Sequence, residues 1–232
     1  MQEPIDADEI LARAAAYPYA APLRSFIQVG AETHELGAAA LELEGRRPLL
    51  CYGANAAPAV LARKLAALPP EPLPLLRAQL GGFDVVYSAH VSPYGAVPAT
   101  LQASAGTTVP VFVAYPTAEQ EETLTASEPN YELHRLHDRA LEVDELGRLD
   151  AVDAYLSRHG CLALEGGAVA LAAVEAEGRR LPALAEAEVL ERVRQILAPE
   201  LELAEFVATG LDPGLAATRT AVLRGGAIPA SF

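Results

Sequence analysis

The sequence predicts an α+β protein built on a small, mixed and mainly antiparallel β-barrel, with flanking helices and an extension at each end. Three observations support this fold class. An apolar strand leads into a glycine turn and a helix within residues 48–68, three closely spaced β-rich runs lie within residues 82–116, and helical patterns prevail beyond residue 184. Closely spaced strands separated by glycine and proline favour an antiparallel sheet or barrel over a wound parallel sheet.

Composition and charge narrow the classes of protein that fit this chain. Its 232 residues, 51% of them hydrophobic and 21% charged, are typical of a soluble globular protein. The formal net charge of −14 argues against nucleic acid as a partner, because the 17 basic residues are scattered among 31 acidic ones. No apolar run approaches the roughly 18 residues that cross a bilayer, and the first residues are acidic where a signal peptide is basic. We therefore expect a cytoplasmic location and no membrane partner.

Rare residue types are informative because the composition is biased. Sixteen of the 17 basic residues are arginine, and asparagine occurs only twice, at Asn55 and Asn130. The two cysteines, Cys51 and Cys161, are too few and too isolated for a disulfide framework, and neither lies in a metal-ligand spacing. We expect no metal and no cofactor.

Residues 1–47 are expected to form an N-terminal extension. A helix is predicted over residues 6–16, because Asp6 can cap its first turn and an apolar face follows. Residues 25–30 and 38–45 alternate in the manner of strands.

Residues 48–150 are expected to form the barrel, beginning with a strand, a turn and a helix. The strand covers residues 48–52 and the turn residues 53–55. The helix covers residues 57–68, with Pro58 in its first turn, where a missing N–H does no harm.

The next stretch of the barrel is rich in proline and then in β-forming residues. Residues 68–76 contain too many prolines for a regular element and predict an extended connection. Three β-rich runs follow, over residues 82–91, 97–104 and 109–116. They predict three strands with breaks between them.

A short helix and further strands complete the barrel segment. Thr117 and Gln120 form a capping-box pattern, and the helix that they start must end before Pro129. Residues 131–143 predict one or two strands, and a turn follows them.

Residues 151–232 are expected to contain a hairpin and helices that partly complete the barrel. The hairpin is predicted about Gly166 and Gly167. The helical patterns cover residues 184–197, 199–211 and 214–225. The sequence leaves open whether this part is a lid, an interface or a packing extension.

The turn at residues 52–55, with the sequence YGAN, is a candidate binding loop. A strand followed by a glycine turn and a helix presents backbone N–H groups, which bind an oxyanion or a carboxylate without a charged side chain. Asn55 can either cap the helix or give its amide to a ligand. A purely structural turn remains the alternative.

Glu128 is a candidate proton-transfer group. It stands between a helix end and Pro129, where neither a helical salt bridge nor a capping role is available to it. If its carboxyl is buried, its pKa should rise toward the range useful for proton transfer at neutral pH. The alternative is an exposed loop glutamate.

The order of these elements resembles that of the gamma-glutamylcyclotransferase family, in which a first strand ends in YGSN and a short helix leads to a catalytic glutamate ahead of a tyrosine. The counterparts in this chain are YGAN at residues 52–55, PATL at 98–101, GTTVPVFVAY from Gly106, and LTASEPNY at 124–131. The resemblance covers the middle of the chain and an expected strand near Val169, but neither the N-terminal extension nor the C-terminal helices.

The resemblance implies an activity and a site. A gamma-glutamyl amine or amide would be cyclised to 5-oxoproline with release of the amine, a small-molecule reaction that needs no nucleophile and no cofactor. The substrate's own α-amine attacks its δ-carbonyl, and one carboxylate can carry the proton to the leaving amine. Glu128 would be the catalytic residue, and the substrate-binding residues would be Tyr52, Gly53, Ala54, Asn55 and Tyr131.

Two departures from the family's pattern concern this site. Ala54 replaces the serine of the motif, which removes a hydroxyl but keeps the backbone N–H. Pro110 stands where the family usually has glycine or another residue with an N–H, and we expect it to remove a donor near the site.

Cys51, His134 and His137 are weaker candidates for a functional role. Strand alternation places the thiol of Cys51 opposite Tyr52, which favours a buried structural cysteine over a nucleophile. His134 and His137 have a spacing that suits a metal only on a helix, whereas their run is predicted to be a strand. The alternative to the enzyme is a non-catalytic small-molecule binding or interaction module with the same fold. The oligomeric state is not predicted.

Overall fold

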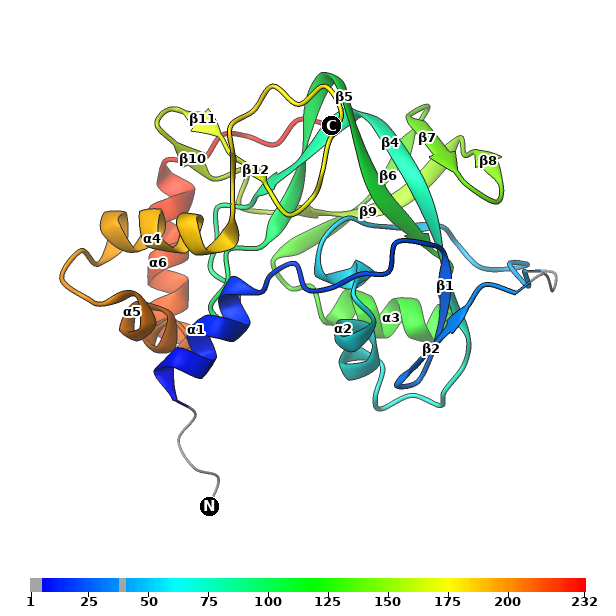
Figure 1. Ribbon diagram of the computed structural model, residues 1–232, viewed down its shortest axis with the longest axis horizontal. Coiled ribbons are helices and arrows are strands. Elements are labelled where there is room, and N and C mark those ends of the chain that lie inside the picture. The colour runs from blue at the N-terminus through cyan, green and yellow to red at the C-terminus, as the bar shows by residue number, and fades with distance from the viewer. Residues whose placement is uncertain (1–5, 38–40) are drawn as a thin grey trace.

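The computed structural model describes residues 6–37 and 41–232. Within them the protein is mixed α+β, with a large, mostly antiparallel sheet (Figure 1). The helices are α1 Ala7–Ala15, α2 Pro58–Lys64, α3 Ala118–Ala126, α4 Glu186–Leu197, α5 Leu203–Thr209 and α6 Pro213–Gly225, and a short 3₁₀ helix, η1, covers Ala54–Ala56. The first nine strands are β1 Phe26–Val29, β2 Glu32–Glu35, β3 Leu49–Cys51, β4 Leu73–Tyr87, β5 Ala99–Ala114, β6 Tyr131–His137, β7 Ala140–Val143, β8 Gly147–Arg148 and β9 Ala151–Ser157. The last four are β10 Ala163–Leu164, β11 Gly167–Ala168, β12 Ala170–Leu171 and β13 Ala183–Leu184.

Two long antiparallel strands, β4 and β5, form the middle of the sheet. They contain 15 and 16 residues, and they pair from Leu75 with Ala114 to Tyr87 with Ala99. The register shifts between Gly81 and Phe83, where residues 104–107 bulge out of the ladder. The break predicted in this stretch is therefore a bulge within one strand, and β5 continues through it.

Strand β4 also pairs with three other strands along its length. Its first residues pair with β1, its middle with β7 and Val86 with β12. The expectation of an irregular connection over residues 68–76 is wrong for its second half, because β4 begins at Leu73. Pro74 is accommodated there because its carbonyl accepts a hydrogen bond from Tyr115 and its other neighbour is the short strand β1.

The sheet is not closed into a barrel, which corrects the expectation from sequence. Along the main path β6 is an edge strand that pairs only with β9, while β7 pairs with β4 and β8. The chain between β6 and β7 turns at Asp138, whose φ is +52°. The segments on the two sides of this turn have different partners, because β6 pairs with β9 and β7 pairs with β4.

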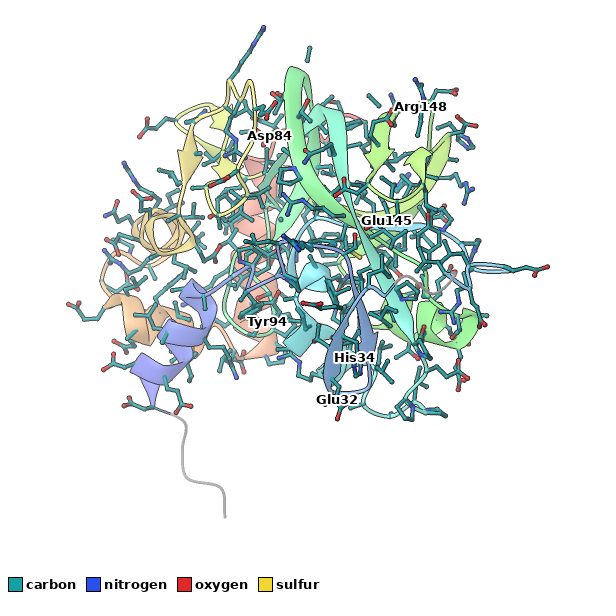
Figure 2. All side chains as sticks on the ribbon, turned by 45° about the vertical axis from the view of Figure 1, so that its right-hand side comes forward. Glu32, His34, Asp84, Tyr94, Glu145 and Arg148 are labelled. Atoms are coloured by element: carbon teal, nitrogen blue, oxygen red, sulfur yellow. The ribbon has the colours of Figure 1, made fainter. Side chains whose placement is uncertain are left out.

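The smaller elements follow the sequence predictions with one exception. Helix α1 is capped by Asp6, helix α3 has the predicted capping box of Thr117 and Gln120, and β10 and β11 form the predicted hairpin. Residues 41–45 are not a strand, because β1 pairs instead with β2, which directly follows it and carries the exposed Glu32 and His34 (Figure 2). Residues 38–40 of the predicted strand lie outside the described residues.

The helices form two groups around the sheet. Helices α1, α4, α5 and α6 gather at one end of the molecule, whereas α2 and α3 lie together below the long strands (Figure 1). In the first group, α1 packs on α4 and α5. The guanidinium of Arg219 on α6 stacks 4.0 Å from the ring centroid of Phe206 and donates to that residue's carbonyl at 2.7 Å, which ties α6 to α5.

Two buried carboxyl groups fasten the C-terminal segment to the sheet. Asp84 on β4, labelled in Figure 2, is fully buried and pairs with Arg179 at 2.9 Å. Glu186, at the start of α4, is 2% exposed and accepts a hydrogen bond from the N–H of Val97 at 2.7 Å through Oε1. Its Oε2 is buried without a partner among the described residues. Burial therefore raises the pKa of Glu186 well above its ordinary value.

We predict that Glu186→Gln stabilises the protein at neutral pH. The folded protein binds the carboxyl proton more tightly than the unfolded chain, so the free energy of unfolding falls as the pH rises from the ordinary value of 4.5 toward the raised pKa. Glutamine removes this titration and still accepts from Val97. Each unit of pKa is equivalent to about 1.4 kcal/mol, so we expect a gain of about 1 kcal/mol or more at pH 7.

The measurement is denaturant unfolding of both proteins from pH 4 to pH 8. The gain should shrink toward zero at the acidic end, whereas the exposed Glu205→Gln in α5 should show no such trend. A gain that is constant with pH would contradict the assignment of the titration to Glu186.

Candidate active site

A cavity of about 400 Å³ lies beside the YGAN loop, and residues far apart in the sequence line it. They come from the end of α1, the loop after β3, the end of α2, the β4–β5 connection and the segment after α3. Its lining residues include Tyr17, Tyr52, Gly53, Asn55, Lys64 and Glu128. The YGAN loop and Glu128, predicted from sequence to share a site, are thus brought to one cavity.

The loop after β3 is shaped by close packing against Tyr17. A Cβ added at Gly53 would lie 2.6 Å from Tyr17 Oη, so a side chain does not fit there. The φ of Gly53 is −135°, which means that close approach, and not the sharp turn expected from sequence, requires the glycine. The Tyr17 hydroxyl is itself held by the N–H of Ala99 at 2.8 Å.

The YGAN loop ends in η1, which leaves backbone donors available. The N–H groups of Ala56 and Ala57 bond back to the carbonyls of Gly53 and Ala54. In the described part of the chain, the N–H groups of residues 53–55 donate to no acceptor. The loop therefore offers main-chain donors to an anionic group in the cavity.

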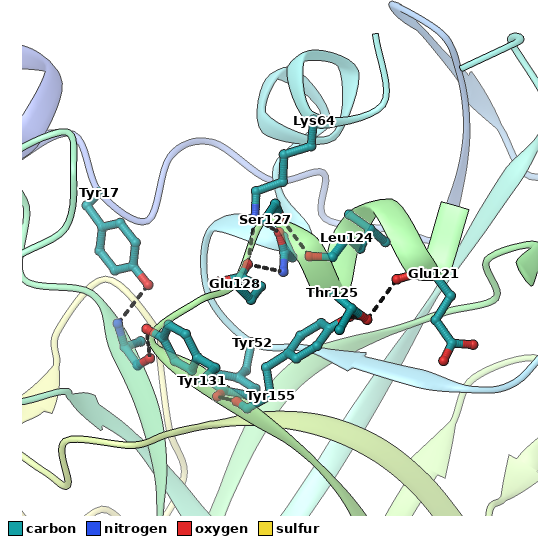
Figure 3. A network of polar contacts seen from close by, with 12 residues as sticks. Tyr17, Tyr52, Lys64, Glu121, Leu124, Thr125, Ser127, Glu128, Tyr131 and Tyr155 are labelled. Atoms are coloured by element: carbon teal, nitrogen blue, oxygen red, sulfur yellow. Dashed lines mark hydrogen bonds and ion pairs between the residues drawn. The ribbon is translucent and has the colours of Figure 1, made fainter. Parts of the chain in front are cut away.

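Asn55, Lys64 and Glu128 form a compact polar triangle (Figure 3). Asn55 Nδ2 donates to Glu128 Oε1 at 2.9 Å, and Lys64 Nζ donates to Asn55 Oδ1 at 2.9 Å. Lys64 also forms an ion pair with the same Glu128 oxygen. The two charged side chains are 15% and 16% exposed, so the pair is largely shielded from water. The capping role left open for Asn55 is wrong, because no side-chain cap is formed on η1 or α2. Its amide bonds to Glu128 and Lys64, and its contact with a ligand stays a prediction.

Glu128 is held by the chain that follows α3. Its N–H bonds to Thr125 O at 3.1 Å, and its carbonyl accepts from the N–H of Tyr131 at 3.0 Å. Its side chain faces the cavity instead of solvent. The sequence predicted only that Glu128 has no salt bridge within its own helix. Its ion-pair partner, Lys64, lies on a different helix, α2.

Tyr52 and Tyr131 line the cavity, but their hydroxyls are engaged elsewhere. The Tyr52 hydroxyl donates to Tyr155 O, and the Tyr131 hydroxyl donates to Ala99 O at 2.9 Å (Figure 3). Tyr52 is buried and Tyr131 is half-buried, and desolvation raises the pKa of both hydroxyls. These two residues therefore offer ring surface to a ligand, with their polar atoms already satisfied.

Three titratable groups that line the cavity, His90, Tyr155 and Cys51, are neutral at physiological pH. Burial lowers the pKa of His90 to about 3 and raises that of Tyr155 to about 12. Burial also raises the pKa of the Cys51 thiol to about 12, which agrees with a structural cysteine. His134 and His137 lie on β6, and no group of three or more potential metal ligands occurs within the described residues.

Sequence reasoning missed two residues of the site and misplaced another. Tyr17 belongs to the N-terminal extension, and no local pattern connects it with the cavity. Lys64 is the single lysine among 17 basic residues, so its rarity was a signal of the same kind as the two asparagines. Pro110 was expected near the site, but it faces Gln79 in the β4–β5 ladder and does not line the cavity.

Comparison with protein-family models, curated proteins and solved structures gave no match for this chain. The family resemblance therefore depends on the sequence motifs alone. None of the helices in the described ranges is long and apolar enough to span a membrane.

We predict that Gly53→Ala destabilises the protein by about 1–3 kcal/mol, because overpacking of this size displaces neighbouring groups. Tyr17→Phe removes the hydroxyl oxygen that the new methyl group would meet. The double variant should therefore be more stable than the sum of the single effects predicts. Thermal and denaturant unfolding of the four proteins measure this coupling, and simple additivity would show that the Tyr17 hydroxyl does not impose the glycine.

Proposed function

We propose that the protein is a gamma-glutamylcyclotransferase-like enzyme that converts a gamma-glutamyl amine or amide to 5-oxoproline and a free amine. The observation that carries the proposal is the position of the Glu128 carboxylate, which shares a cavity with the YGAN loop and is hydrogen-bonded to Asn55. The cavity has room for a small-molecule substrate. We also propose that the enzyme works in the cytoplasm, on the basis of composition.

The proposed reaction needs positioning and proton transfer. The substrate's α-nitrogen forms a bond to its δ-carbon, and the bond from that carbon to the leaving nitrogen breaks. The α-ammonium group loses two protons as it becomes the lactam N–H, and the leaving nitrogen gains two as it becomes an ammonium. Glu128 accepts these protons in turn and delivers them to the leaving nitrogen. The free N–H groups of residues 53–55 stabilise the negative charge that develops on the carbonyl oxygen, and Ala54 retains this capacity because its contribution is a main-chain donor.

A second candidate function is a binding module without catalysis. The ion pair between Lys64 and Glu128 favours it, because the carboxylate oxygen that would accept the proton is already occupied by a cation. In this case the cavity would bind a small molecule, and the carboxylate would be a recognition group.

We expect the purified protein to release 5-oxoproline from gamma-glutamyl amines or dipeptides. Glu128→Gln should reduce release by about a hundredfold or more, because one residue acts as both base and acid. Glu119→Gln, an exposed substitution on α3, is the matched control and should have no effect. Ala54→Ser should leave the rate unchanged or raise it.

The readout is chromatographic detection of 5-oxoproline, with circular dichroism to verify that each variant is folded. Release that persists in folded Glu128→Gln protein would refute the assigned mechanism. No release from any substrate by the unaltered protein would support the binding module.

A further inference from the structure

We infer that Lys64 and Glu128 together form a recognition site for the zwitterion of an α-amino acid, with Lys64 binding the α-carboxylate and Glu128 binding the α-ammonium group. The inference rests on the proposed function, because the gamma-glutamyl group of the substrate carries this zwitterion. It also assigns separate tasks to two anion-binding features of the cavity. Lys64 takes the permanent carboxylate, and the N–H groups of residues 53–55 are left for the charge that develops during reaction.

The cavity wall holds two opposite charges that share one amide partner. A cation and an anion from different elements meet at one point of its wall, each about one sixth exposed. Asn55 lies against both and presents its oxygen to the lysine and its nitrogen to the carboxylate. This amide gives each charged group a partner that stays in place when the other moves away.

Binding of a zwitterion would exchange the internal ion pair for two ion pairs with the ligand. In the free protein Lys64 and Glu128 neutralise each other. When an α-amino acid enters between them, its ammonium replaces Lys64 at the carboxylate, and its carboxylate replaces Glu128 at the lysine. No shielded charge is left unpaired. A ligand with only an ammonium or only a carboxylate breaks the same ion pair and leaves one protein charge without an opposite charge. The neutral Asn55 amide is then its remaining contact, which is unfavourable away from water.

Lys64 and the adjacent Arg63 both line the cavity but differ in burial and in contacts. Arg63 also lines the cavity, but it is exposed and makes no ion pair within the described ranges of the chain. Lys64 points inward from the last turn of α2 and makes two polar contacts in the site (Figure 3). Lys64 is the chain's single lysine among 17 basic residues, whereas Arg63 is of the common type.

The same balance separates substrate from product. Cyclisation converts the α-ammonium group into a neutral lactam N–H and leaves the carboxylate unchanged. The product therefore satisfies Lys64 but not Glu128, and Glu128 competes with it for the lysine. We expect 5-oxoproline to bind more weakly than an α-amino acid of similar size.

The test is a calorimetric or NMR titration with three matched probes that cannot cyclise. L-Norleucine has both charges, pentylamine is its decarboxylated form, and hexanoate is its deaminated form. The unaltered protein should bind norleucine about tenfold or more tightly than either of the others. If hexanoate or pentylamine binds as tightly as norleucine, the inference is refuted without recourse to any variant.

Variants then assign the carboxylate contact. Lys64→Met should lower the affinity for norleucine about tenfold and should not weaken the binding of pentylamine, since Glu128 no longer has an internal partner. Lys64→Arg keeps the cation, so it should keep part of the preference for norleucine that Lys64→Met loses. If Lys64→Met does not fold, the partial loss in Lys64→Arg is the test. Arg63→Met is the matched control and should keep the order of the unaltered protein. An unchanged preference in Lys64→Met, or an equal loss in Arg63→Met, would overturn the assignment.

These titrations are independent of turnover because none of the probes yields 5-oxoproline. A protein that releases 5-oxoproline but does not prefer norleucine refutes the recognition site and leaves the proposed function standing. A protein that prefers norleucine through Lys64 but releases no 5-oxoproline from any substrate supports the recognition site and refutes the proposed function.

Discussion

The β4–β5 ladder is the constraint on which the rest of the structure depends. Strand β4 pairs with β5 along its length and also with β1, β7 and β12, so the N-terminal, central and C-terminal parts of the chain join one sheet through it. Fifteen residues can do this because β5 pairs with one edge of β4, while β1, β7 and β12 pair with successive segments of the other edge. Without this pairing the short strands have too little hydrogen-bonded length to be stable.

The cavity follows from the same ladder. Its wall includes the connection between β4 and β5, and Ala99 at the start of β5 provides two backbone contacts that hold tyrosines. The Tyr17 hydroxyl accepts from its N–H, and the Tyr131 hydroxyl donates to its carbonyl. A single residue of the sheet thus holds two tyrosines of the cavity wall. Close packing of Tyr17 in turn leaves no space for a side chain at Gly53.

Besides the exposed Arg63, the charged groups described in the cavity are one shielded ion pair. The tyrosines and His90 are neutral because burial disfavours their charged forms. The ion pair of Lys64 and Glu128 stands in these surroundings with the Asn55 amide beside it. In a chain of net charge −14, one shielded lysine gives a local positive group that the overall field does not supply. This group can contact an anionic or zwitterionic ligand, whereas the net charge of the chain supplies no long-range attraction for an anion.

The sequence by itself determined the α+β class, the capped helices α1 and α3, the strand, turn and helix around YGAN, and the hairpin about Gly166. Each of these depends on neighbouring residues, through capping, turn geometry or alternation, so local pattern was sufficient. The joint use of Asn55 and Glu128 also came from sequence, because rarity and an odd position beside Pro129 marked them.

Tertiary structure alone decided the open sheet, the continuity of β4 and β5, and the partners of the site. Closure depends on whether two distant strands meet, and in the described chain β6 pairs with β9 on one side and with no strand on the other. Pro74 in β4 and residues 104–107 in β5 are predicted locally to interrupt a strand. Each strand nevertheless continues, because β4 and β5 pair with each other over most of their length. Tyr17 and Lys64 reach the cavity through packing between elements that are separate in sequence. No local pattern encodes such contacts, because their free energy comes from burial and ion pairing that exist only once the chain is folded.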